Sequence, residues 1–177
     1  MLLLWSGSQN AQLGSGPEKQ HLADLVEEYG LTAKIKLLGS VPPSEIPGWL
    51  NKCDAGILPL RRDVFLDFAF PNKLPEFIIM GKAVLMSRLL TIRHYFSEEA
   101  LCYFEANNPA DLAKQMVRLY LDRALRPRLA ARARQEYAPL RWDLMAERYL
   151  KLMADLSGSA YSSTRKSDVG VMSATGR

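Results

Sequence analysis

Apolar residues follow two patterns that alternate along the chain. In some stretches they form short continuous runs, as in strands covered on both faces; in others they recur every three or four positions, as in amphipathic helices. The runs predict strands at residues 2–5, 33–39, 54–60, 83–86 and 101–104. The helical spacing predicts helices over residues 17–29, 44–53, 72–80, 109–123, 125–137 and 140–156.

This alternation predicts an α/β fold: a Rossmann-like, mostly parallel sheet with helices on both faces. In such sheets, ligands bind where the carboxyl ends of the strands meet. The segments that follow predicted strands are therefore the places to look for chemistry. They are Gly14–Lys19, Gly39–Ser44, Leu60–Glu76 and Ser87–His94.

Two asparagines are expected to begin helices. Asn72 and Asn108 each precede a helical stretch, and their side chains can accept hydrogen bonds from free first-turn N–H groups. After Asn108, Pro109 and Asp111 strengthen the helix start, because proline suits the first position and an acid suits the positive helix end.

Composition narrows the class of protein. The 177 residues are 48% apolar and 24% charged, typical of a globular domain, and exclude collagen-like, fully disordered or disulfide-framework chains. We expect one domain over residues 1–156. We also expect a disordered tail over 157–177, where serine, glycine and threonine prevail. A formal net charge of +4 does not suggest a specific nucleic-acid binder.

The two cysteines, Cys53 and Cys102, form no Cys-x-x-Cys motif and have no histidine nearby. They fit reduced thiols in a cytoplasmic protein, and the sequence predicts no metal site. No run reaches the roughly 18 apolar residues of a transmembrane segment.

The segment from Leu58 to Phe77 carries the most informative polar residues. Lys73 opens a predicted helix at the ligand-binding edge, where free N–H groups favour phosphate. Glu76 suits a vicinal diol such as a ribose, and Arg61 and Arg62 can close over phosphates. The alternative is that these are solvated charges of a loop and a helix surface.

Several motifs, taken in order, resemble those of the C-terminal, donor-binding domain of retaining GT-B glycosyltransferases of the family-4, group 1 type. The resemblance covers about residues 11–153. The motifs are Gly14-x-Gly16-Pro17, Leu38-Gly39-Ser40-Val41-Pro42, Asp54–Pro59, Pro71–Phe77, Gly81–Val84 and Asn108–Ala113.

The resemblance implies a nucleoside diphosphate sugar as substrate, with no separate cofactor. It implies that Glu76 holds the ribose hydroxyls, that the helix start at Asn72, Lys73 and Leu74 meets the diphosphate, and that the turn from Gly39 to Val41 lies beside the nucleobase. It assigns no catalytic residue here.

Three departures from the family pattern stand out. The first acid of the Glu-x7-Glu motif is replaced by Phe68, and neighbouring Asp67 is the candidate to face the donor sugar. The opening strand-helix unit with its Arg/Lys pair, and the domain that holds the acceptor, are not recognisable. The apolar strand expected before Gly14 is interrupted by polar residues.

Two other functions stay open. The chain could be a non-catalytic nucleotide-binding or protein-interaction module on the same fold. Arginines of the C-terminal helices could bind nucleic acid, although their spread around the helices favours a solvated face instead. They are Arg118, Arg123, Arg126, Arg128, Arg132 and Arg134.

Overall fold

The structure is a computed structural model that describes residues 2–6 and 9–158. The chain divides into two compact units, residues 1–138 and 139–177. The predicted tail begins at Ser157, which ends the last helix, and from residue 159 onward it lies outside the described residues.

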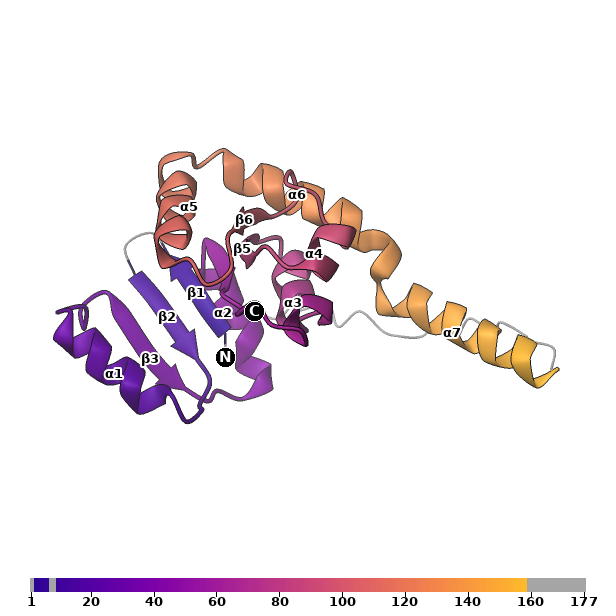
Figure 1. The fold of residues 1–177 in the computed structure, drawn as a ribbon, viewed down its shortest axis with the longest axis horizontal. Helices are drawn as coiled ribbons and strands as arrows, with labels where there is room; N and C mark the ends of the chain where they lie inside the picture. The colour runs from indigo at the N-terminus through magenta and orange to yellow at the C-terminus, as the bar shows by residue number, and fades with distance from the viewer. Residues whose placement is uncertain (1, 7–8, 159–177) are drawn as a thin grey trace, which may run out of the picture. The chain divides into compact units, whose positions relative to one another are not determined.

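The first unit holds all six described strands and most of the helices (Figure 1). The strands are β1 (Leu2–Ser6), β2 (Gln9–Leu13), β3 (Ile35–Gly39), β4 (Ala55–Leu58), β5 (Ala83–Ser87) and β6 (Cys102–Phe104). The helices of this unit are α1 (Lys19–Glu28), α2 (Ile46–Lys52), α3 (Lys73–Ile79), α4 (Leu90–Tyr95), α5 (Pro109–Leu121) and α6 (Leu125–Tyr137), with 3-10 turns η1 (Pro43–Glu45) and η2 (Leu66–Phe68).

The strands form one sheet in the order β3-β2-β1-β4-β5-β6. β2 pairs parallel with β3, and β4, β5 and β6 pair parallel with one another. β1 is antiparallel to both of its neighbours, so β2 and β4 run in the same direction on either side of it. The predicted mostly parallel α/β sheet is therefore confirmed, with one reversed strand near its centre.

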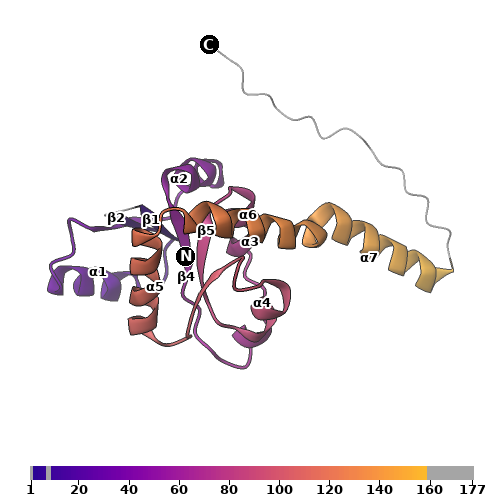
Figure 2. The same cartoon turned by 90° about the horizontal axis from the view of Figure 1, so that it is seen from above.

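Alternate residues of the central strands face different helices. Ala55 and Ile57 join a core cluster that includes Leu119 of α5 and Leu129 of α6. Gly56, between them, faces the ring of Phe77 on α3, on the opposite side of the sheet. Helices thus cover both faces, as the sequence predicts (Figures 1 and 2). All residues of β4 and β5 are buried, in agreement with their uninterrupted apolar runs.

β2 and α4 are the elements that apolar patterns did not reveal. The sequence of β2, Gln-Asn-Ala-Gln-Leu, is mostly polar, and backbone pairing with β1 and β3 holds it in the sheet. The polar residues expected to interrupt the strand before Gly14 therefore include Gln9 and Asn10 of β2 itself. α4 has only six residues, too few for a helical repeat to stand out.

The two predicted helix caps have different outcomes. Asn108 has extended backbone angles and its side chain accepts a hydrogen bond from the N–H of Asp111 at 3.0 Å, which confirms the prediction. The cap at Asn72 was wrong: its φ of −57° and ψ of −22° are already helical, and its side chain makes no capping bond. A capping residue needs non-helical angles to aim its oxygen at the first turn.

The second unit contains the helix α7 (Trp142–Ser157) and the last two residues of the 3-10 turn η3 (Ala138–Leu140). Apolar residues recur along α7 at helical spacing, and Gly158 ends it in the left-handed conformation with φ of +67°. No described helix combines the length and apolar character needed to cross a membrane.

Candidate functional site

One edge of the sheet collects the loops that the sequence analysis singled out. Because β2 to β6 all run in the same direction, the segments after Leu13, Gly39, Leu58 and Ser87 leave the sheet on one side. The four segments therefore emerge at the same edge of the sheet, as the sequence predicts.

The loop after β4 is held by two aspartates. Asp63 accepts a hydrogen bond from the N–H of Leu66 at 2.8 Å and so begins η2. Asp67 pairs with Arg62 at 3.2 Å and also accepts from the N–H of Leu90 at 3.3 Å, which links η2 to the start of α4. Of the two predicted arginines, Arg62 is thus already neutralised within the loop.

The start of α3 presents an ion pair. Lys73 Nζ lies 3.0 Å from Oε1 and 3.2 Å from Oε2 of Glu76, and each side chain keeps 35% of its surface exposed. Leu74 lies between them in sequence, and its side chain is fully buried. Only the backbone of Leu74 could therefore contact a ligand. Lys73 and Glu76 are together and accessible, as a ligand-binding pair requires.

The turns after β2 and β3 are joined to each other. The N–H of Gly14 donates to the carbonyl of Gly39 at 2.6 Å, and the hydroxyls of Ser15 and Ser40 lie 2.9 Å apart. Gly39 has a φ of +72°, which favours glycine there. Val41, predicted to lie beside a nucleobase, is half-buried in the following segment.

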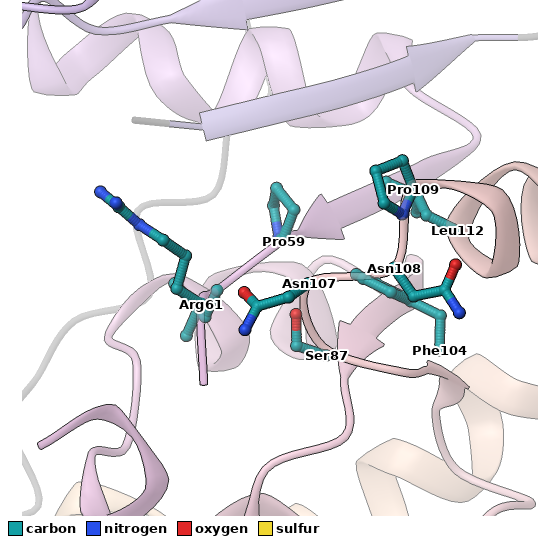
Figure 3. A pocket seen from close by; sticks show the side chains of 9 residues that line it. Pro59, Arg61, Ser87, Phe104, Asn107, Asn108, Pro109 and Leu112 are labelled. Carbon is teal, nitrogen blue, oxygen red and sulfur yellow. The ribbon is translucent and has the colours of Figure 1, made fainter. Parts of the chain in front are cut away.

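A pocket of about 190 Å³ lies at the carboxyl ends of β4, β5 and β6, beside the start of α5 (Figure 3). Arg61 is the predicted site residue that lines it. The Arg61 side chain is exposed and extends away from Ser87 and Asn107 in Figure 3. Within the described part of the chain it makes no ion pair. Arg61 is therefore an unpaired cation at the mouth of this pocket.

Ser87 and Asn107 also line the pocket. Ser87 opens one of the four segments that the sequence analysis singled out but was given no role there, and Asn107 was not selected. Ser87 is fully buried, and its hydroxyl donates to the carbonyl of Leu58 at 3.4 Å. Asn107 has a φ of +62°. The sequence signals for these roles are a hydroxyl at the carboxyl end of a buried strand and an asparagine two residues before a helix-starting proline.

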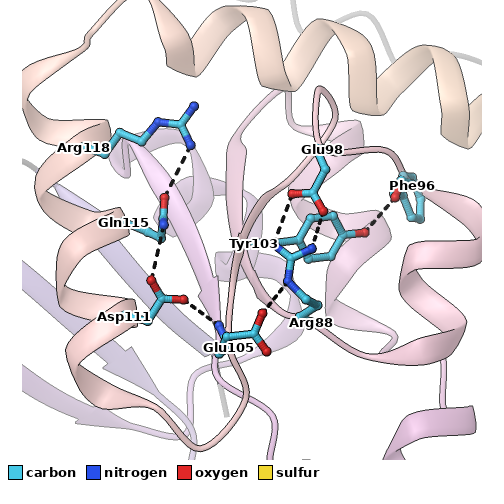
Figure 4. A network of polar contacts seen from close by, with 8 residues as sticks. All are labelled: Arg88, Phe96, Glu98, Tyr103, Glu105, Asp111, Gln115 and Arg118. Atoms are coloured by element: carbon cyan, nitrogen blue, oxygen red, sulfur yellow. Dashed lines mark hydrogen bonds and ion pairs between the residues drawn. The ribbon is translucent and has the colours of Figure 1, made fainter.

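A polar network fixes the loops after β5 and β6 (Figure 4). The guanidinium of Arg88 pairs with Glu98 and, at 2.7 Å, with Glu105, and lies over the ring of Tyr103. Hydrogen bonding to Glu98 and the charges of both carboxylates raise the pKa of Arg88. Burial raises the pKa of Tyr103, whose hydroxyl donates to the carbonyl of Phe96. These groups contact one another, so they hold the loops of this edge in place.

Three of the arginines that suggested nucleic acid have partners in the chain itself. Arg126 is the clearest: it donates to the carbonyl of Leu119 at 2.8 Å, pairs with Asp54 at 3.2 Å and stacks on Trp5. Arg132 pairs with Glu136, and Arg118 contacts Gln115. The view of these residues as one solvated face is therefore wrong for Arg126.

Both cysteines are buried thiols without a disulfide. Burial raises the pKa of each to about 11. Among the described residues, no three His, Cys, Asp or Glu side chains gather as metal ligands would.

Comparison with known proteins shows similarity to glycosyltransferases in both sequence and fold. A putative teichuronic acid biosynthesis glycosyltransferase, TuaH, of Bacillus subtilis is 30% identical over 73 residues, which are 41% of this chain and 18% of TuaH.

Among solved structures, sucrose-phosphate synthase from Thermosynechococcus elongatus is similar with a TM-score of 0.73 and 19% identity, over 85% of this chain and 39% of that one. Anabaena HepE, solved in complex with UDP, has a TM-score of 0.65 and 17% identity, over 84% of this chain and 40% of that one. The C-terminal domain of the group 1 glycosyl transferase LpcC from Francisella tularensis has a TM-score of 0.58 and 20% identity, over 67% of this chain and 60% of that one.

These structures confirm the fold, and the chain spans about two fifths of the first two. The sequence model of the family described as Glycosyl transferases group 1 matches residues 9–122, well over half of the chain. Since the match includes the loops after β2, β3 and β4 and the start of α3, the chain belongs to the glycosyl transferases group 1 family.

Proposed function

We propose that this chain binds a nucleoside diphosphate sugar at the carboxyl edge of its sheet. In the proposed reaction, the sugar passes to a hydroxyl acceptor with retention at the anomeric carbon, and a separate domain holds the acceptor. The observation that carries the proposal is the partly exposed Lys73–Glu76 pair at the edge where the loops after β2 to β5 emerge. HepE, a protein of similar fold, has been solved with UDP and with UDP-glucose.

In this proposal Lys73 and Glu76 bind different parts of the nucleotide. A diphosphate attracts the ammonium of Lys73, and the released carboxylate of Glu76 accepts hydrogen bonds from the two ribose hydroxyls. Separating the pair costs little, because both side chains are partly exposed and such pairs contribute only about 0–1 kcal/mol. α3 has seven residues, so the charge of Lys73 matters more than the helix dipole.

Arg61 and Asp67 extend this arrangement. The unpaired guanidinium of Arg61 is suited to bind a second phosphate oxygen. Arg62, next to it in sequence, pairs with Asp67. Asp67 takes the place of the missing motif acid and faces the donor sugar. Its bonds to Arg62 and to the N–H of Leu90 fix its position in the loop.

In this proposal the chain contributes to transfer chiefly by positioning the donor and by stabilising charge on the departing diphosphate. No group among the described site residues is assigned as a nucleophile or general base.

Calorimetric titration of UDP and GDP tests the proposal. Replacing Glu76 by glutamine removes the charge but keeps the shape. Since a hydrogen bond to a charged group contributes about 1.5–3 kcal/mol, Glu76→Gln should weaken binding roughly tenfold to a hundredfold. Asp67→Asn should leave the affinity for UDP and GDP almost unchanged, because its proposed partner is the sugar.

Glu27→Gln, on the exposed surface of α1, is the matched control and should bind like the unmodified chain. If Glu76→Gln binds as tightly as the control, the assignment of Glu76 to the ribose is wrong. If neither nucleotide binds the unmodified chain, the donor-binding proposal itself fails.

A further inference from the structure

We propose that Lys19 selects the nucleobase, favouring bases that present a keto oxygen over those that present an amino group at the same ring position. This inference rests on the proposed function and on the placement of the nucleobase beside the turn from Gly39 to Val41, which the sequence resemblance implies. It adds a residue from a different loop and predicts which nucleotides the site prefers.

The turns after β2 and β3 form one continuous rim. The hydrogen bond from Gly14 to the carbonyl of Gly39 joins their backbones, and Ser15 and Ser40 join their side chains. A ligand beside Gly39 therefore also meets the segment that leads from β2 into α1. Lys19 is the first residue of that helix.

The Lys19 side chain reaches back across this rim to Gly39. A methyl group built on Gly39 would lie 3.3 Å from Lys19 Nζ, so the ammonium occupies the space that a side chain would otherwise fill. In the described part of the chain, Lys19 makes no ion pair. A cation placed over a glycine turn, with no acid to neutralise it, is free to bind an acceptor on a ligand.

The chemistry of the ammonium determines the preference. Lysine offers three donors and no acceptor. Uracil presents a keto oxygen at position 4, where cytosine presents an amino group that can only donate. Guanine and adenine differ in the same sense at position 6. Lys19 can therefore bind uracil or guanine at that position and faces a donor in cytosine or adenine.

The serine hydroxyls of the rim do not share this property. Ser15 and Ser40 can each donate or accept, so neither distinguishes a keto oxygen from an amino group. They are also hydrogen-bonded to each other. The selectivity is therefore assigned to Lys19 alone.

The test compares UDP with CDP, which differ on the base ring at position 4 (with the linked change at N3) and carry identical ribose and diphosphate groups. Calorimetry on the unmodified chain should give tighter binding of UDP. Lys19→Met keeps the length of the side chain and removes its donors. We expect it to lower UDP affinity about tenfold and to leave CDP affinity nearly unchanged, so that the preference disappears.

Two further variants make the test specific. Lys19→Arg keeps a donor-only cation and should retain the preference for UDP. Lys34→Met removes an exposed lysine just before β3, at the opposite edge of the sheet, and should have no effect. Thermal unfolding of each variant checks that it folds.

The results separate this inference from the proposed function. Equal losses of UDP and CDP affinity in Lys19→Met would show that Lys19 binds the diphosphate, and would overturn the selectivity. Unchanged affinities would overturn it as well. If Glu76→Gln loses nucleotide binding while Lys19→Met binds like the unmodified chain, the proposed donor site is supported and only the role of Lys19 is rejected. Absence of any nucleotide binding to the unmodified chain rejects both.

Discussion

Gly56 allows α3 to pack closely on the centre of the sheet. A methyl group at Gly56 would lie 2.4 Å from the ring of Phe77, which is fully buried and has no room to withdraw. Overpacking of a core typically costs about 1–3 kcal/mol. Gly56→Ala should therefore lower the free energy of unfolding by about that amount, as measured by urea denaturation.

The control for this substitution is Gly48→Ala in α2, where nothing lies within 4 Å of the added methyl group. Alanine loses less backbone entropy than glycine in a helix, so this variant should be unchanged or more stable by about 0.5–1 kcal/mol. A Gly56→Ala protein as stable as Gly48→Ala would show that Phe77 does not pack against β4 as described.

Glu136 gives the fold a pH dependence. Burial opposes ionisation of its carboxylate, but hydrogen bonds from the N–H and hydroxyl of Ser97, at 2.8 and 2.7 Å, and from Arg132 outweigh it, so its pKa lies below the ordinary 4.5. A lowered pKa in the folded state stabilises the fold at pH values above 4.5, and this stabilisation disappears as the pH falls through the folded-state pKa.

Glu136→Gln should accordingly be less stable than the unmodified chain at pH 7, by about 1.5–3 kcal/mol, because it loses hydrogen bonds to a charged group. The difference should shrink when denaturation is repeated at successively lower pH below 4.5. A difference that stays constant on acidification would contradict the role given to the ionised carboxylate.

Two helix starts with the same residue type provide a matched comparison at the scale of the elements. The Asn108 side chain caps α5, while Asn72 precedes α3 without a capping bond. Asn108→Ala should lower the free energy of unfolding by about 1 kcal/mol, and Asn72→Ala should lower it by much less. Equal losses in urea denaturation would mean that the cap on α5 does not stabilise it.

The same elements show what the sequence could predict. β4 and β5 were predictable because burial on both faces of the sheet leaves continuous apolar runs in their sequences. β2 was not predictable, since a strand held by pairing on both edges can carry polar residues such as Gln9 and Asn10. Whether Asn72 caps a helix depends on its own backbone angles, which residue type does not determine.

The candidate site was predictable as far as topology determines it. Chain direction brings the loops after β3 and β4 to one edge, and the i, i+3 spacing on a helix brings Lys73 next to Glu76. The pairing of Arg62 with Asp67 and the reach of Lys19 to Gly39 depend on loop geometry. No periodic pattern encodes loop geometry, so these contacts had to come from the structure.

For the whole molecule, we expect the 177-residue chain by itself to bind a nucleotide without transferring sugar. It covers about two fifths of the chains of sucrose-phosphate synthase and HepE that it resembles, and in our proposal the acceptor is held elsewhere. Release of UDP from UDP-glucose should not exceed that of a Glu76→Ala control. Turnover above this control would show that the chain contains a complete active site.

β1 also has a consequence for aggregation of the folding chain. It is the only described strand that joins β2–β3 to β4–β5–β6, and it closes one edge of each through Leu4, which lies opposite both Ala11 and Gly56. If residues 2–6 detach, two rows of unpaired N–H and C=O groups open at once, one of them on the apolar strand β4. Exposed apolar strand edges recruit other chains. Fraying of this single strand is therefore the event that we expect to begin aggregation.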